Sequence, residues 1–375
     1  MARKRNLNIE ILRIVAMIMI IVLHGLDKGR LLRLYFGNGN AAFLGSWVLE
    51  SFAIAGLNMY MLITGYFMVS GRLRSGRLLE IILTVLYYSV GIITVLLLLF
   101  KVIGFNIIGT FTLNDLFKCV LPLHMESYWF CTAYVVFYLF LPVLAVGVKN
   151  MGKKALLITI ILLLIFETAF KSVLPVTFEI DDKGYSALWF ITLFLVAAYI
   201  RLYGIKFFKD VKRGVITYVV CSLLILIEEL SIQLVYAKTG HLELLERISY
   251  DYNHVFVLLG SVGLFTAFVN AKEREFKAEK VISAFATGSF GVYLIHEHVF
   301  LRFKWPEWLG ITGLSDKNPV VLVLWVIAAA VMVYIVCACL DMIRQQIFKT
   351  VEKASEGKKV STFLTELDKK LNGEI

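Results

Sequence analysis

Long apolar runs recur along the whole chain, and they constrain its fold more than any other feature. A helix needs about 20 consecutive apolar residues to cross the hydrocarbon core of a bilayer. Inside lipid, only helices and closed barrels satisfy all their backbone hydrogen bonds. Of the 375 residues, 59% are hydrophobic and 18% are charged, whereas a soluble domain is about 25% charged. We therefore expect an all-α, polytopic membrane protein.

The apolar runs predict about ten transmembrane helices joined mostly by short loops. They lie at residues 7–26, 46–69, 78–103, 128–148, 155–175, 186–204, 214–236, 253–271, 286–303 and 319–346. We expect one membrane domain over residues 1–348 and a cytoplasmic tail over residues 349–375. The tail alternates charged and apolar residues, which fits either a short amphipathic helix on the inner leaflet or a solvated tail.

Lysine and arginine residues flank the predicted spans instead of forming one basic patch. The net charge of +10 therefore indicates membrane orientation rather than binding to nucleic acid. When the spans alternate in direction, most of these cations fall on one side, in "ARKR", "GRLRSGR", "KNMGKK", "IRLYGIKFFKDVKRG", "NAKEREFKAEK" and the tail. Because cytoplasmic loops carry the excess of positive charge, we expect a multi-pass plasma-membrane protein with both termini in the cytoplasm.

The first predicted span carries an arginine toward one end and a histidine at the other. In "EILRIVAMIMIIVLH", Arg13 and His24 are eleven positions apart. This is about three helical turns, so both side chains share one stripe, about 16 Å apart along the axis. Glu10 precedes Arg13 by three positions and can pair with it. Ionisable groups inside a membrane usually face a cavity or a partner, so we expect a polar passage along this stripe; a snorkelling arginine and an interfacial histidine are the alternatives.

Other ionisable residues also fall inside the predicted spans. They are Glu167, Glu228, Glu229, His254, His296, His298 and Asp341. Each can be either a packing partner or part of a functional site. A carboxylate such as Glu167 or Glu228 could orient His24, and no spacing argument chooses between them.

The cysteine and histidine spacing predicts no metal site. The five cysteines form no CxxC pair and show no zinc-binding spacing. In "YLIHEHVF", His296 and His298 are two positions apart, so they point to nearly opposite faces of a helix and cannot share one metal ion.

Three arginines, Arg72, Arg74 and Arg77, lie in "GRLRSGR", where a predicted span meets the cytoplasm. The planar guanidinium group suits phosphate. One interpretation is a site for a phosphate-bearing cytosolic cofactor, and the other is ordinary positive-charge anchoring at the membrane surface.

Together these segments resemble acyltransferase family 3, the integral-membrane O-acyltransferases that modify bacterial cell-surface sugars. The motifs that carry the resemblance are "IEILRIVAMIMIIVLH", "NMYMLITGYFMVSGRLRSGR", "YWFCTAYVVFYLFLPVL", "SALWFITLFLVAAYIRLYG" and "SFGVYLIHEHVF". The resemblance implies about ten helices around a central cavity in the bacterial plasma membrane. It also implies acetyl-CoA or another acyl-CoA as the donor, and a hydroxyl of a cell-surface polysaccharide or lipid-linked glycan as the acceptor.

By motif match, His24 takes the essential histidine position of this family and Arg13 the position of its arginine partner. Arg72 and Arg74 fall on the motif that engages the cofactor. Some members carry an extra extracytoplasmic esterase-like domain; this chain ends soon after its last predicted span, which leaves room for a separate extracytoplasmic partner.

The chemistry of acyl transfer gives these residues roles. A base must deprotonate the acceptor hydroxyl, or a nucleophile must hold the acyl group in transit, and a histidine can do either near neutral pH. We expect His24 to be this general base or acyl carrier, with Arg13 holding a polar part of the donor and Glu10 orienting Arg13. A transporter or flippase for a lipid-linked sugar is the alternative function, although no inverted repeat or pair of broken helices is evident.

Overall fold

The chain folds as a bundle of helices, as the apolar runs predict. The computed structural model describes residues 6–33, 41–69, 71–169, 172, 182–241, 247–273, 277–355 and 359–371, and these contain helices and turns but no β-strand. Seven helical segments in the described chain are long and apolar enough to cross a membrane. They are Leu7–Lys28 (α1), Ala42–Met68 (α2 and α3), Ser75–Ile103 (α4), Trp129–Asn150 (α6), Val211–Thr239 (α10), Ile248–Asn270 (containing α11) and Pro319–Val351 (within α14).

Shorter helices occupy the remaining predicted spans. The predicted span 155–175 contains most of α7 (Lys153–Leu164) and a π-helical turn at Ile165–Ala169, and most of its last residues lie outside the described chain. The span 186–204 corresponds to α9 (Ala187–Tyr203), and the span 286–303 overlaps α12 (Glu279–His296). Two short helices, α5 (Leu113–Val120) and α13 (Lys304–Trp308), lie in connections between longer ones.

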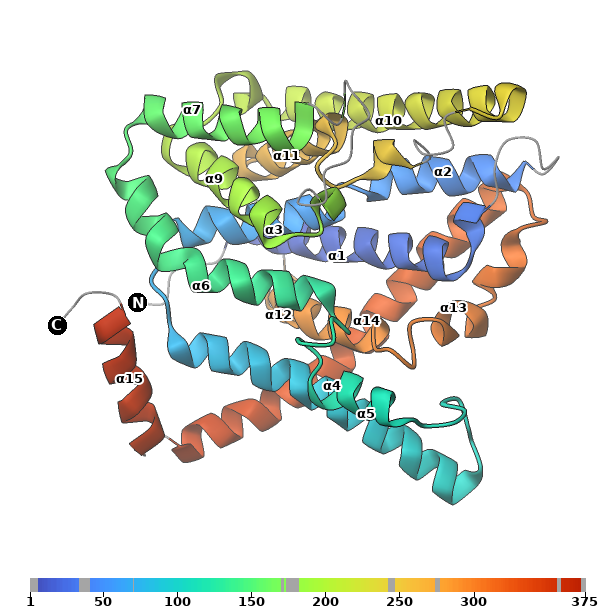
Figure 1. Cartoon of the computed structure of the whole chain (residues 1–375), viewed down its shortest axis with the longest axis vertical. Helices are drawn as coiled ribbons and strands as arrows, with labels where there is room; N and C mark the ends of the chain where they lie inside the picture. The colour runs from blue at the N-terminus through green and yellow to red at the C-terminus, as the bar shows by residue number, and fades with distance from the viewer. Residues whose placement is uncertain are drawn as a thin grey trace.

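Helix α1 lies inside the bundle, in contact with α2, α3, α11, α12 and α14 (Figure 1). Its first turn is capped by Asn6, whose side-chain oxygen accepts a hydrogen bond of 3.3 Å from the amide of Ile9. Because neighbouring helices surround α1, most of its residues face protein rather than lipid. The position of α1 therefore decides which residues of the other helices can meet Arg13 and His24.

The second predicted span is broken into two helices, a feature that the sequence pattern does not predict. Helix α2 (Ala42–Ala53) ends and α3 (Gly56–Met68) begins around a turn at Ile54 and Ala55. A Cβ atom at Gly56 would lie 2.9 Å from the carbonyl oxygen of Ala16, so only glycine allows α3 to approach α1 this closely. No proline marks the break, and the hydropathy of the segment stays high across it.

Helix α12 ends earlier than its apolar sequence predicts. The helix stops at His296, and the amide of the next residue, Glu297, bonds to the carbonyl groups of Tyr293 and Ile295. Val299, Phe300 and Leu301 continue the apolar run beyond this point, which is why hydropathy alone extends the span to residue 303. The early stop places Glu297 at the end of α12 and turns the chain toward α13.

The C-terminal region forms helices that stay with the bundle. Helix α14 runs from Pro319 to Ser355, through the predicted domain boundary at residue 348. Helix α15 (Lys359–Leu371) then packs against α4, where Asp368 accepts a hydrogen bond of 2.6 Å from the amide of Ser75. The tail is therefore helical where it is described, and it lies at the same end of the bundle as the start of α1 (Figure 1).

A buried polar network joins α4, α12 and α14. Asp341 of α14 is fully buried and accepts hydrogen bonds from Tyr88 (2.7 Å), Arg344 (2.7 and 3.1 Å) and Gln345 (2.7 Å). Its carboxyl group packs directly on Gly291 of α12, where a Cβ atom would overlap it. Asp341 is thus a packing partner, which was one of the two interpretations that its sequence position allowed.

We predict that Gly291→Ala destabilises the protein by displacing Asp341 from this network. The loss of well-made buried hydrogen bonds should cost about 1–3 kcal/mol, which would appear as a lower unfolding temperature in detergent. Gly91→Ala is the matched control, because a Cβ atom there meets nothing within 4 Å. An unfolding temperature of Gly291→Ala equal to that of Gly91→Ala would contradict the prediction.

Candidate functional site

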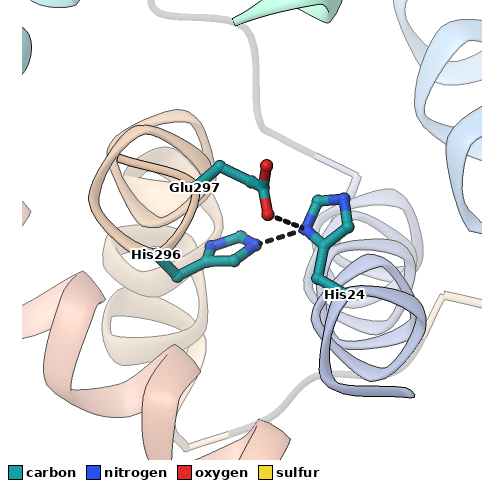
Figure 2. Close-up of side chains that lie close together, drawn as sticks. All are labelled: His24, His296 and Glu297. Carbon is teal, nitrogen blue, oxygen red and sulfur yellow. Dashed lines mark hydrogen bonds and ion pairs between the residues drawn. The ribbon is translucent and has the colours of Figure 1, made fainter. Parts of the chain in front are cut away.

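Two histidines and a glutamate meet where the end of α12 approaches α1. The Nδ1 atom of His24 lies 2.9 Å from Nε2 of His296 and 3.2 Å from Oε1 of Glu297 (Figure 2). His296 is 2% exposed and Glu297 7% exposed, and the His24 side chain keeps 17% of its surface. The three groups are therefore largely removed from water, and only His24 retains appreciable access.

The hydrogen bonds determine the arrangement of protons on the two neutral rings. Nδ1 of His296 lies 2.6 Å from the carbonyl oxygen of Val292, and a carbonyl can only accept, so this nitrogen carries the proton. Nε2 of a neutral His296 is then an acceptor, and Nδ1–H of His24 must be the donor to it. The lone pair of His24 is therefore left on its other nitrogen, Nε2, which is free to take a proton or attack a carbonyl carbon.

A cavity extends from this cluster toward the other end of α1. Its wider part, about 300 Å³, is lined by both Arg13 and Arg77. It narrows to about 20 Å³ beside His24, which is room for about one water molecule. Both parts share Tyr60, Phe130 and Phe290 as lining residues, so they adjoin along α1, with two guanidinium groups at the wide end and the imidazole of His24 beside the narrow end.

The arginines chosen from the sequence fall into two groups. Arg13 and Arg77 face the cavity; Arg13 pairs with Glu10 at 3.5 Å, as the spacing predicts, and Arg77 pairs with Glu80 at 2.6 Å. Arg72 and Arg74 precede α4 and are exposed, outside the residues that line the cavity. All three arginines of the "GRLRSGR" segment lie around the first turn of α4, whose amide groups favour anions.

The carboxylate beside His24 is Glu297, rather than either residue considered from the sequence. Glu167 instead accepts a hydrogen bond of 2.6 Å from the hydroxyl of Thr192. Glu228 lies 3.5 Å from Nε2 of His254. Residue spacing does not indicate Glu297 as a partner of His24, although Glu297 stands between two histidines in "YLIHEHVF", because only a tertiary contact brings α12 to α1.

The same three groups could also hold a divalent cation. One nitrogen from each histidine and one oxygen of Glu297 lie within 4.8 Å of one another, and two histidines with a glutamate form a known catalytic zinc ligand set. His298, the other histidine of the motif, is not part of this set, because it bonds to the carbonyl of Ser89 at 3.1 Å and points away. Local spacing could not detect a ligand set whose members are 272 positions apart.

Comparison with known proteins identifies one family. A family model described as an acyltransferase domain matches residues 6–342, nearly the whole chain. Searches of curated proteins and of solved structures returned no match.

We predict that the neutral ring of His24 carries its proton on Nδ1 and none on Nε2. Solid-state NMR of protein carrying nitrogen-15-labelled histidine reports the protonation of each ring nitrogen directly. Comparison with His24→Gln assigns the signals of His24. His298→Gln serves as the control, since it removes a ring that bonds elsewhere. A neutral His24 ring protonated on Nε2 would contradict the assignment.

Proposed function

Since the chain belongs to the acyltransferase family whose model spans residues 6–342, we propose that it moves an acetyl or similar acyl group from cytosolic acyl-CoA to a hydroxyl of a cell-surface polysaccharide or lipid-linked glycan. One observation carries this proposal. The free Nε2 of His24 stands at the narrow end of a cavity whose wide end holds two guanidinium groups.

The wide end of the cavity suits the donor. Coenzyme A carries phosphates at one end and a thioester at the end of a long pantetheine arm. Arg77, which lines the cavity, and the exposed Arg72 and Arg74 just before it in sequence offer permanent positive charge to the phosphates. Arg13, farther along α1, can hold a polar group of the arm. From Arg13 to His24 the helix rises about 16 Å, so an arm lying along α1 brings the thioester toward the imidazole.

The transfer step follows from the arrangement of protons. The acceptor hydroxyl gives its proton to Nε2 of His24 while its oxygen attacks the thioester carbonyl. The carbon–sulfur bond then breaks, and the thiolate leaves with the proton returned from His24. The products are the O-acylated sugar and free coenzyme A. Glu297, 3.2 Å from Nδ1, stabilises the imidazolium that forms in between, and His296 holds the ring in orientation.

The expected orientation of the protein in the membrane is consistent with this transfer. Lysine and arginine are in excess at the end of the bundle that holds Arg13. This excess favours an orientation in which that end faces the bacterial cytoplasm, where acyl-CoA is made. His24 then lies toward the outer surface, where a glycan acceptor would arrive. The narrow passage beside His24 supports transfer of a small acyl group and does not favour the alternative function, transport of a whole lipid-linked sugar.

We predict that His24→Ala lowers acyl transfer by about 10²–10⁴-fold, the range typical of losing a general base. The measurement is transfer of labelled acetate from acetyl-CoA to surface glycan in membranes that contain equal amounts of protein. Glu297→Gln should give a smaller loss, because it removes charge but keeps shape. His298→Gln should transfer at the normal rate, and near-normal transfer by His24→Ala would refute the proposal.

A chelator separates base catalysis from metal catalysis at the same cluster. With His24 as the base, turnover should be insensitive to a zinc chelator. A cation bound by His24, His296 and Glu297 would instead make turnover depend on added zinc.

We predict that Arg72→Ala combined with Arg74→Ala weakens acyl-CoA binding by about tenfold or more, because charge-assisted bonds to phosphate are lost. Arg77→Ala should weaken binding in the same assay. Arg213→Ala, a change at an exposed arginine at the start of α10, is the control. Unchanged affinity in the double variant would place the phosphates elsewhere.

A further inference from the structure

An aromatic wall leads from the protein surface to His24. It consists of Trp129 at the start of α6, Tyr185 before α9 and Tyr252 before α11. The Trp129 and Tyr185 rings lie 4.4 Å apart between centroids, and the Tyr185 and Tyr252 rings 4.9 Å apart. Trp129 and Tyr252 line the narrow space beside His24, whereas Tyr185 is 40% exposed. The wall thus has one end in solvent and the other at the proposed base.

The backbone that holds Tyr185 in the wall is strained. Asp182, Lys183 and Gly184 have successive φ angles of 40°, 56° and 80°, a left-handed conformation that non-glycine residues rarely adopt. The carbonyl of Lys183 accepts a hydrogen bond of 3.1 Å from the amide of Tyr252. At Gly184, a Cβ atom would lie 2.9 Å from Cβ of Tyr252. Such strain persists only where the surrounding structure enforces it, and it often marks a ligand site.

A buried carboxylate with an unused oxygen lies near this wall. Glu50 of α2 is 3% exposed, and its Oε2 has no hydrogen-bond partner within the described chain. Its Oε1 lies 3.7 Å from the guanidinium of Arg247, whose side chain is 47% exposed. The next residue after Glu50, Ser51, lies 2.8 Å from the hydroxyl of Tyr250, two positions before Tyr252. A buried acceptor left without a donor is costly, so this oxygen points to a ligand that brings a hydroxyl.

Arg247 is held in place by a second strained position. Its φ angle is 68°, and its amide donates a hydrogen bond of 3.1 Å to Glu229 of α10. Glu229 is itself fully buried and bonded to Gln233 at 2.8 Å. Two strained turns, at residues 182–184 and at residue 247, therefore hold Tyr185 and Arg247.

We propose that Trp129, Tyr185, Tyr252, Glu50 and Arg247 form the acceptor subsite, which binds one pyranose ring of the glycan. The C–H face of the ring stacks on the aromatic side chains, one ring hydroxyl donates to Oε2 of Glu50, and Arg247 donates to another hydroxyl oxygen. Aromatic side chains with a few well-placed polar groups are the usual lining of such sites. The role of the bound sugar in acyl transfer rests on the function proposed above, but its binding does not.

Sugar binding is tested on the full chain in detergent, by the rise in unfolding temperature that a ligand causes. The probes are methyl glycosides of glucose, galactose, mannose and N-acetylglucosamine, with cyclohexylmethanol as an apolar ring that carries a single hydroxyl. We expect at least one glycoside to raise the unfolding temperature saturably and cyclohexylmethanol to have no such effect. No rise with any glycoside, or an equal rise with cyclohexylmethanol, would overturn the proposal.

Two variants test the residues, each with a control. Tyr185→Leu and Glu50→Gln should raise the half-saturating glycoside concentration by about tenfold or more, as expected for the loss of one buried contact. Tyr203→Leu changes a tyrosine of similar exposure, 37%, at the other end of α9, and Glu307→Gln changes an exposed glutamate; both should bind as the wild type does. A half-saturating glycoside concentration equal to that of the wild type, in either Tyr185→Leu or Glu50→Gln, would overturn the assignment.

Acetyl-CoA turnover separates this proposal from the function on which it rests. His24-dependent turnover without any effect of glycosides on the unfolding temperature would refute the acceptor subsite alone. Glycoside binding that is weakened by Tyr185→Leu, without His24-dependent turnover, would refute the acyltransferase mechanism alone.

Discussion

The contact of α1 with the end of α12 is the interaction on which the site depends. A histidine placed inside a membrane bundle needs polar partners, because a buried polar group without them is costly. His24 finds two partners at once, His296 and Glu297, at 2.9 and 3.2 Å. The bond from His296 to the carbonyl of Val292 fixes the proton on that ring, and this determines which nitrogen of His24 remains free. The protein thus prepares a base through a chain of hydrogen bonds that begins in the backbone of α12.

The positions of α12 and α1 depend on close approaches of other helices to each of them. On one side of α12, Gly291 leaves room for the buried carboxyl group of Asp341, which gathers Tyr88, Arg344 and Gln345 around it. Helix α3 approaches α1 at Gly56, next to the break between α2 and α3, which no hydropathy signal marks. Small residues at such points let backbones approach closely, so the position of His24 depends on glycines remote from the chemistry.

The two ends of the cavity are lined by different kinds of side chain. Guanidinium groups of Arg13 and Arg77 face the wide part, and aromatic rings surround the narrow part at His24. An anionic donor and a neutral, hydroxyl-bearing acceptor would therefore enter from opposite directions and meet at the imidazole. The strained turn at residues 182–184 contacts Tyr252 at the aromatic end, where rigid placement of an acceptor matters most for transfer.

The sequence by itself determined the class of fold, the position of most membrane-spanning segments, and the pairing of Glu10 with Arg13. These depend on hydropathy and on the period of a single helix, which are local properties of the chain. The prediction that His296 and His298 diverge is confirmed, but not through the helical period on which it rested, because α12 ends at His296 and His298 lies beyond it. Only the tertiary structure decided that Glu297 stands beside His24, that Arg77 joins Arg13 in one cavity, and that α12 stops at His296. Those outcomes depend on how helices distant in sequence pack against one another, and the apolar residues that drive packing in a membrane are too uniform to specify their partners in advance.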